Sequence, residues 1–124
     1  MKIAITSQGN GLDASVDPRF GRCAYFIVVD PDTEEIEVVS NPAAEAAGGA
    51  GPRAAQTVAD KGVEAVITGN VGPNAFQTLK AANIKVYQGA AGTVRETLVK
   101  FKDGKLAGLS DSSVPDHFGL SQGK

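Results

Sequence analysis

The sequence has little of what disulfide-bonded, metal-binding and membrane proteins need. It contains one cysteine, Cys23, and one histidine, His117, among 124 residues. Because there is only one of each, the sequence excludes an intramolecular disulfide, a CxxC redox motif and a closed Cys/His metal site. The apolar run from Met1 to Ser7 is too short for a signal-peptide core or a membrane span. The composition therefore predicts a cytoplasmic protein without a membrane partner.

An excess of charge of one sign is also missing. Lys plus Arg number 12 and Asp plus Glu number 14, so the formal net charge is −2. That balance argues against a nucleic-acid partner held by bulk neutralisation of phosphates. The length suits one compact domain, whose core is large enough to fold without a disulfide or a structural metal. We expect this domain to span residues 1–109, followed by a flexible, polar tail over residues 110–124.

Short β-branched runs alternate with helical patterns along the chain. Turn residues separate the second and third apolar runs, which predicts an antiparallel hairpin. Pro52 and Pro73 suit first helical positions, Asn83 suits a left-handed cap, and Thr93 with Glu96 forms a capping box. The predicted strands are Ile3–Ser7, Ala24–Val29, Ile36–Val39, Val63–Ile67 and Ile84–Tyr87, and the predicted helices begin at Pro52, Pro73 and Thr93.

The element order β-β-β-α-β-α-β-α predicts an α/β fold, with a mixed five-stranded sheet and three helices packed on it. This order resembles the three-layer ribonuclease H-like fold. Nucleases of that type hold two divalent ions with carboxylates from the first strand and elsewhere. The first strand here has no acidic residue, and the fourth is followed by Thr68, Gly69 and Asn70. The nuclease centre is therefore missing, which favours a binding role.

Glycine is abundant, with 15 residues that fall mostly in loops leading into predicted helices. If the first, fourth and fifth strands are parallel, the loops after them meet at one edge of the sheet. Helix N-termini present unpaired N–H groups there, and glycine lets a ligand approach the backbone. We predict an anion pocket with arginines at its rim. Its candidate residues are Arg19, Phe20, Gly21, Arg22, Gly48, Gly49, Gly51, Arg53, Gly69, Asn70, Gly72, Asn74, Gly89, Gly92 and Thr93, with Cys23 as the candidate metal ligand.

A plainer interpretation is that each glycine only forms a turn or a helix cap, but four such loops together favour the pocket. Known phosphate and nucleophile motifs do not fit. The run from Gly49 to Ala54 has GxGxxA spacing without a strand directly before it, and no GxxxxGK[ST] motif is present. Ser7 has no plausible base, since the histidine lies at position 117. The sequence therefore predicts a protein that is not an enzyme.

Six motifs are distinctive: Met1–Ile5, Arg19–Phe26, Asn41–Pro42, Gly48–Gly51, Gly72–Phe76 and Gly89–Val94. Together they resemble the dinitrogenase iron-molybdenum cofactor biosynthesis family, with NifX, NafY and the C-terminal domain of NifB. The resemblance covers about residues 1–109. It implies a ribonuclease H-like fold and noncovalent carriage or insertion of anionic metal-sulfur clusters. These clusters include iron-molybdenum cofactor precursors of Fe-S or Mo-Fe-S type and, in an orange-coloured relative, a molybdenum-copper sulfide (Mo-Cu-S type).

The resemblance also implies partners, namely metallocofactor assembly proteins or an acceptor apo-protein. Many relatives have histidine where this chain has Arg19, so a familiar imidazole ligand is absent. Backbone N–H groups and arginines would hold the cluster, with at most Cys23 as a protein ligand. Few covalent ligands keep release fast enough for transfer, whereas permanent redox sites use several thiolates.

Two other functions remain open. A phosphate- or nucleotide-binding regulatory module would use the same loops, and it predicts stabilisation by a nucleotide without metal. An enzyme would need Asp13, Asp17 or Ser7, whose spacing matches no catalytic template. We expect a monomer, because the acidic residues Glu34, Glu35 and Glu37 oppose pairing of the third strand between subunits.

Overall fold

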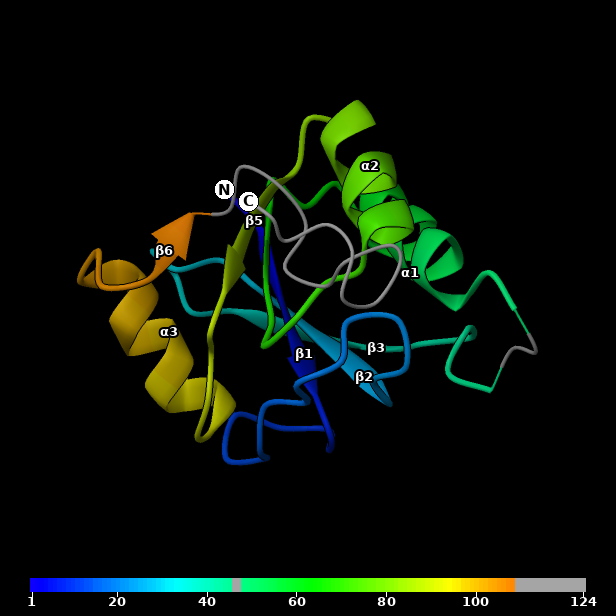
Figure 1. Cartoon of the computed structure of the whole chain (residues 1–124). Coiled ribbons are helices and arrows are strands. Elements are labelled where there is room, and N and C mark those ends of the chain that lie inside the picture. Colours follow the sequence, from blue (N-terminus) through cyan, green and yellow to red (C-terminus); the bar gives the residue numbers. More distant parts are fainter. Residues whose placement is uncertain (46–47, 109–124) are drawn as a thin grey trace.

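The structure is a computed structural model that describes residues 1–45 and 48–108 (Figure 1). At its centre lies a six-stranded sheet in the order β3-β2-β1-β4-β5-β6. Strands β1, β4 and β5 are parallel, whereas β2 runs antiparallel to β1 and β3, and β6 runs antiparallel to β5. The strands are β1 (Ile3–Ser7), β2 (Tyr25–Val29), β3 (Ile36–Ser40), β4 (Ala65–Ile67), β5 (Lys85–Gln88) and β6 (Ala107–Gly108).

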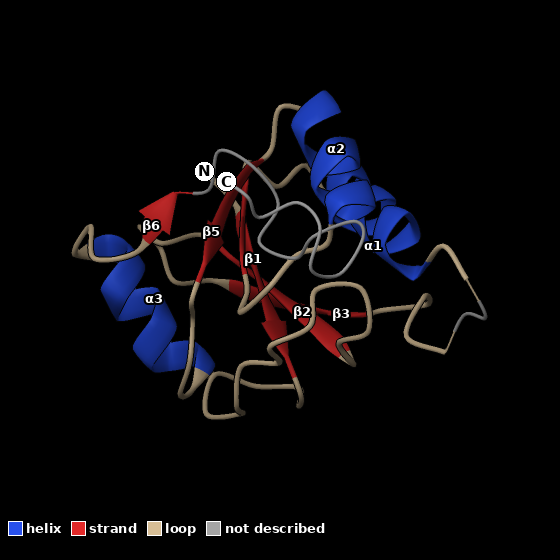
Figure 2. Cartoon of the chain, viewed as in Figure 1, coloured by secondary structure: helices blue, strands red, loops and turns tan. Residues whose placement is uncertain are grey.

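Three helices cover the two faces of this sheet. Helices α1 (Ala50–Asp60) and α2 (Pro73–Ala81) pack side by side on one face, and α3 (Val94–Lys102) lies on the other (Figures 1 and 2). The carboxyl ends of the parallel strands lead into α2 and α3, as expected for short crossovers. The predicted α/β class, with a mixed sheet and three helices, is confirmed.

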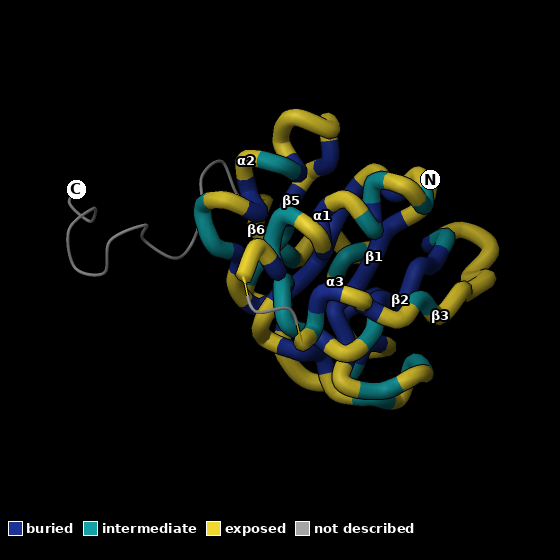
Figure 3. Tube along the Cα trace, turned by 90° about the vertical axis from the view of Figure 1, so that its right-hand side faces the viewer, coloured by how far each residue is buried: buried dark blue, intermediate teal, exposed yellow. Residues whose placement is uncertain are grey.

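Side chains that alternate along the strands form one core on each face of the sheet. Ala4, Phe26 and Val28 pack toward α1 and α2, whereas Ile5 and Ile27 pack toward α3. All residues of β1 are buried because helices cover both faces, while β3 is exposed along most of its length (Figure 3). A strand buried on both faces is typically continuously apolar, which explains why β1 lacks the alternation of a half-buried strand.

Several local predictions are confirmed by the structure. Helix α2 begins at Pro73, and Asn83 has a positive φ of 62° just after that helix. Thr93 and Glu96 form the capping box of α3 through both of its hydrogen bonds. β2 and β3 form the antiparallel hairpin that the turn residues after Val29 predicted.

Other expectations were wrong in detail. The sheet has six strands rather than five, because Ala107 and Gly108 pair with Gln88 and Tyr87. Ala-Gly has no β-branched or alternating pattern, so this strand is created by its neighbour rather than by local preference. Helix α1 starts at Ala50 instead of Pro52, which places Pro52 inside the first turn, where its missing N–H costs nothing.

The tail predicted over residues 110–124, with His117, lies outside the described residues. Within residues 1–45 and 48–108, no helix has the length and apolar character that crossing a membrane requires.

Candidate functional site

The N-termini of α1 and α2 face a common cavity of about 350 Å³. Three chain segments that are far apart in the sequence form its wall. They are the loop before β2, the glycine-rich loop before α1 and the loop between β4 and α2. The lining residues are Gly21, Arg22, Gly49, Ala50, Gly51, Pro52, Gly72, Pro73, Asn74 and Ala75.

Two glycines allow these segments to approach closely. A Cβ added to Gly21 would lie 3.0 Å from the backbone nitrogen of Gly51. A Cβ added to Gly51 would lie 2.9 Å from the Cβ of Ala75 on α2. A Cβ contact under 3.0 Å is essentially never found, and one of 3.0 Å is tighter than most, so larger side chains here would push the loop away from α1, or α1 away from α2. The glycines at positions 21 and 51 therefore determine the width of the cavity.

The helix ends at this cavity lack a side-chain cap. The N-cap of α1 is Gly49 and that of α2 is Gly72, and neither supplies a side-chain hydrogen bond to the first turn. The first turn of each helix also lacks an acidic residue. The first four N–H groups of a helix have no intrahelical partner, and the helix dipole favours negative charge near them. Two such ends at one cavity favour an anionic ligand.

Arg22 provides a full positive charge in this cavity. Its guanidinium Nη1 donates a hydrogen bond to the carbonyl oxygen of Ala44 at 3.2 Å, so the side chain bridges two loops. Arg22 also borders a second cavity of about 380 Å³, together with Asp17 and Arg19. The two cavities thus meet at Arg22. Its planar guanidinium suits the oxygen acceptors of phosphate or carboxylate and the sulfur acceptors of sulfide.

Arg19 lies in the second cavity rather than between the helix ends. Its Nε and Nη2 donate to Asp17 Oδ1 and Oδ2 at 3.2 and 3.3 Å, and its backbone N–H donates to Oδ1 at 2.9 Å. Asp17 is 3% exposed at its side chain, whereas Arg19 is 63% exposed. Hydrogen bonding to Asp17 raises the pKa of the Arg19 guanidinium above its ordinary value. Asp17 thus holds Arg19 in place. The third predicted arginine, Arg53, lines neither cavity and is exposed on α1.

Cys23 lies in the core and not on the cavity wall. Its side chain is fully buried, and its thiol donates to the carbonyl oxygen of Phe20 at 3.3 Å. Burial, followed by the nearby charge of Asp17, raises the pKa of the thiol to about 12. The thiolate is the form that binds metal, so this environment keeps Cys23 protonated. Phe20 is also buried, with its ring centroid 5.6 Å from that of Phe26, as a core residue would be.

Asn41 is a positioning residue that the sequence argument missed. Its buried side-chain amide donates to the carbonyl oxygens of Gly21 at 3.0 Å and Cys23 at 2.8 Å, and its Oδ1 accepts from the N–H of Ala43 at 3.0 Å. The Asn41 amide therefore connects the loop that carries Arg22 to the loop that contains Ala44, whose carbonyl oxygen accepts a hydrogen bond from Arg22. The Asn-Pro pair directly after β3 was the available signal, because asparagine often satisfies backbone groups at turns.

Gly69 and Asn70 connect loops instead of lining the cavity between the helix ends. The N–H of Asn70 donates to the carbonyl oxygen of Pro18 at 2.8 Å, and the N–H of Phe20 donates back to Asn70 at 3.2 Å. A Cβ on Gly69 would lie 2.7 Å from the Cα of Pro18, so this approach requires glycine. The resulting short parallel bridge holds the arginine-bearing loop against the end of β4.

The fourth predicted loop leads to the other face of the sheet. Gly89, Gly92 and Thr93 precede α3 and do not line the cavity between α1 and α2. Their segment pairs with the first loop, since the N–H of Val16 donates to the carbonyl oxygen of Gly92 at 2.8 Å. The Glu96 carboxylate accepts from the N–H of Thr93 at 2.8 Å, so α3 already has an internal anion at its N-terminus. That bond lowers the pKa of Glu96.

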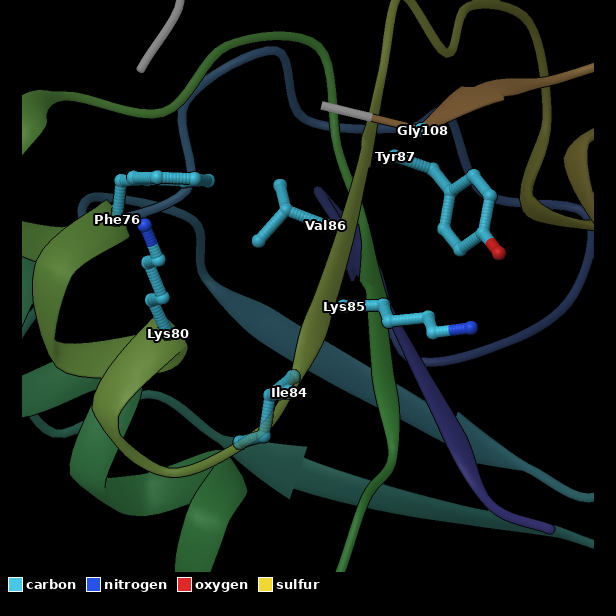
Figure 4. A pocket seen from close by; sticks show the side chains of 7 residues that line it. All are labelled: Phe76, Lys80, Ile84, Lys85, Val86, Tyr87 and Gly108. Atoms are coloured by element: carbon cyan, nitrogen blue, oxygen red, sulfur yellow. The ribbon is translucent and has the colours of Figure 1, made fainter. Parts of the chain in front are cut away.

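Another hollow lies between α2 and β5, and it contains none of the predicted site residues. The residues that line this cavity of about 460 Å³ include Phe76, Lys80 and Val86 on one side of β5, and Lys85 and Tyr87 on the other (Figure 4). Within residues 1–45 and 48–108, no three or more histidine, cysteine, aspartate or glutamate side chains are grouped so that they could hold a metal ion. The lining of the cavity between α1 and α2 includes the N-termini of both helices and Arg22.

Comparisons with known proteins agree on one family. A model of the dinitrogenase iron-molybdenum cofactor family matches residues 1–104. The apo form of the orange protein from Desulfovibrio gigas has a TM-score of 0.87 and 47% identity, covering 90% of this chain and 94% of that chain. A Thermotoga protein described as a candidate NifB protein has a TM-score of 0.75 and 47% identity, covering 85% and 90%. An uncharacterized protein of Methanocaldococcus jannaschii is 36% identical over 109 residues, or 86% of this chain and 89% of that protein.

Proposed function

The chain belongs to the dinitrogenase iron-molybdenum cofactor family, and we propose that it binds an anionic metal-sulfur cluster as cargo and carries or inserts it during cofactor assembly. The cargo would be an iron-molybdenum cofactor precursor or a related Fe-S, Mo-Fe-S or Mo-Cu-S cluster. Its partners would be the assembly proteins that load the cluster or the apo-protein that accepts it. We also propose the ribonuclease H-like assignment for the order of β1 to β5 and a role without catalysis.

One observation carries this proposal. Two helix N-termini without side-chain caps open into the same cavity, with Arg22 in its wall. The cavity of about 350 Å³ has room for a small polynuclear cluster with several sulfide ligands. Sulfide at a cluster surface accepts hydrogen bonds from N–H groups, and the negative charge of the cluster interacts favourably with both helix dipoles.

The donor set supports transport more than permanent residence. Backbone N–H groups and a guanidinium hold an anion without a covalent bond, so release requires no ligand exchange at a metal. Cys23, the candidate thiolate ligand, is buried and has a pKa of about 12. We therefore assign retention to Arg22 and to the helix ends, and leave Cys23 a core residue.

Loading the protein with defined clusters tests this function. The full chain would be purified without oxygen, incubated with tetrathiomolybdate, alone and with Cu(I) or Fe(II), and desalted before visible absorption and metal content are measured. We expect stoichiometric retention of a coloured species by the native chain. Arg22→Ala should weaken retention about tenfold or more, because a hydrogen bond to a charged group contributes about 1.5–3 kcal/mol.

Arg95→Ala is the matched control. Arg95 is an exposed arginine on α3, with its Nε 3.0 Å from Asp13 Oδ1, and it does not line the cavity between α1 and α2. This variant should retain the cluster as the native chain does, and Cys23→Ala should do the same. Equal losses in Arg22→Ala and Arg95→Ala would reject the assigned cavity. An absence of retention, together with thermal stabilisation by a nucleotide alone, would favour the phosphate-binding module instead.

A further inference from the structure

Strand β3 is an open edge of the sheet. It pairs with β2 on one side, and in the described chain no strand lies on its other side. Ile36 and Val38 on this strand are large apolar side chains that are 42% and 39% exposed. They lie on the same face, because they are opposite Val29 and Ile27 in the neighbouring strand. An apolar edge of this kind is a template for another strand.

The glutamates of this segment are less of an obstacle than the sequence indicated. Lys61 Nζ lies 2.7 Å from Glu37 Oε2, and Lys102 Nζ lies 2.6 Å from Glu34 Oε2. Each lysine lowers the pKa of its glutamate by hydrogen bonding and charge. Two of the three carboxylates therefore already have a positive partner within the same chain.

We propose that β3 pairs antiparallel with β3 of a second copy of this chain, with Val38 at the centre of the pairing. In this register Ile36 lies opposite Ser40 of the partner subunit, and Glu37 lies opposite the partner's Val39. The remaining glutamates, Glu34 and Glu35, then face proline and asparagine rather than another carboxylate.

Side-chain direction favours this register, and no pair of like charges lies directly across it. Like charges directly opposite each other destabilise a strand pair, and none of the three glutamates is placed in that way. The exposed apolar side chains of the two copies meet on the α3 face, where each continues the apolar rows of β2. The arrangement has twofold symmetry, so both copies use the same surface. It does not rest on the proposed cargo.

Sedimentation velocity over a wide range of protein concentrations tests this dimer. One strand pair buries less area than a standard interface, so we expect a mass that rises from monomer toward dimer with concentration. Val38→Lys places two positive charges opposite each other and should weaken the association at least about tenfold. Val99→Lys is the matched control, since Val99 is 52% exposed on α3, and it should leave the association unchanged. A monomer mass at every concentration up to about 1 mM would overturn the proposal.

Cysteine cross-linking tests the register itself. Opposite Cα atoms of an antiparallel pair lie about 4.5–5.5 Å apart, within the range of a disulfide. Val38→Cys should therefore form a covalent dimer on mild oxidation. Ile36→Cys and Ser40→Cys should link only when the two variants are mixed, because these positions face each other. Cross-linking of Val99→Cys to the same extent as Val38→Cys, or of Ser40→Cys alone, would overturn the pairing.

Discussion

The N-termini of α1 and α2 differ from the N-terminus of α3 in what satisfies their free N–H groups. All three helices follow glycine-containing loops. At α3 the Thr93 hydroxyl accepts from the N–H of Glu96, and the Glu96 carboxylate accepts from the N–H of Thr93. At α1 and α2 the cap residues are Gly49 and Gly72, which supply no side-chain acceptor. The N-terminus of α3 therefore has the Glu96 carboxylate as an internal anion. The N-termini of α1 and α2 have none and leave space for an anionic ligand.

This difference shows why glycine before a helix is an incomplete signal. Gly92 and Gly49 both have a positive φ, of 82° and 70°, but Gly49 is itself the N-cap of α1, whereas Gly92 precedes the N-cap Thr93 of α3. The cap residue and the first turn distinguish the two helix ends, because Thr93 and a glutamate three residues later satisfy N–H groups at α3. The comparison predicts that an anion binds where such a glutamate is missing, and each of the following changes tests that.

The largest effect is expected from forcing apart the two uncapped helices that form the cavity. Gly51→Val would place side-chain atoms against Ala75, since even a Cβ would lie 2.9 Å from the Ala75 Cβ. Overpacking of this kind costs about 1–3 kcal/mol, so we expect the free energy of unfolding to fall by about 2 kcal/mol and cluster retention to fall with it. Denaturant titration and metal content after desalting measure the two effects.

Gly48→Val is the control for this change. A Cβ at Gly48 meets no atom within 4 Å, and the position lies in the loop directly before α1, three residues from Gly51. Its free energy of unfolding should stay within about 0.5 kcal/mol of the native value. A loss as large as that of Gly51→Val would mean that a β-branched residue near the start of α1, and not contact with α2, is responsible.

The next effect concerns binding alone. Gly72 has a φ of −77° and open space around its Cβ position, so a side chain can act there as an N-cap. Gly72→Asp gives α2 an internal anion, as Glu96 does for α3, and should weaken cluster retention about tenfold. Gly72→Asn caps the helix about equally well but carries no charge, so retention should remain close to native. Equal retention by both variants would show that the dipole and N–H groups of α2 do not bind the cargo.

A smaller effect is expected at the helix that has its own cap. Thr93→Ala removes the acceptor for the Glu96 N–H and should lower the free energy of unfolding by about 1 kcal/mol. Cluster retention should not change, because α3 lies on the other face of the sheet. Thr93→Ser keeps the hydroxyl and should restore most of the stability. A loss of retention in Thr93→Ala, at a temperature where the variant is folded, would place the α3 loop in the site.

The smallest effect is the pH dependence of the same cap. The pKa of Glu96 is lowered from 4.5 in the folded chain, mainly by hydrogen bonding to Thr93. Its contribution to stability is therefore fully present above the unfolded pKa and is lost as the pH falls through the folded pKa. The stability difference between the native chain and Glu96→Gln should shrink when unfolding is followed from pH 6 to pH 3. A difference that stays constant over this range would show that the charge of Glu96 does not contribute.

The local elements of this fold were predictable because their signals lie within a few residues. Pro73 starts α2, Asn83 adopts the left-handed conformation after it, and Thr93 with Glu96 caps α3. Each of these is determined by φ restriction or by one side-chain hydrogen bond. The sixth strand was not predictable, since Ala107 and Gly108 have weak strand preference and extend only because β5 offers a free edge.

The candidate site was likewise only partly predictable from the sequence. Glycine-rich loops and arginines in the sequence predict an anion pocket, which stays a prediction. Of the predicted residues, Gly21, Arg22, Gly49, Gly51, Gly72 and Asn74 line the cavity between α1 and α2. The sequence did not reveal that Asp17 holds Arg19 in a neighbouring cavity or that the amide of Asn41 joins two loops. Such contacts depend on which loops lie side by side, and the hydrophobic periodicity of the sequence contains no information about that.

Composition and local chemistry by themselves determined the class of this protein. One cysteine, one histidine and a nearly balanced charge exclude several kinds of site, and runs of β-branched residues between helical patterns specify an α/β sheet. The tertiary structure decided which helix ends share a cavity. Crossovers send α1 and α2 to one face and α3 to the other, so loops of similar sequence end in different surroundings. The physical reason is that local preferences act over one or two turns, whereas a cavity is formed by packing between segments distant in the sequence.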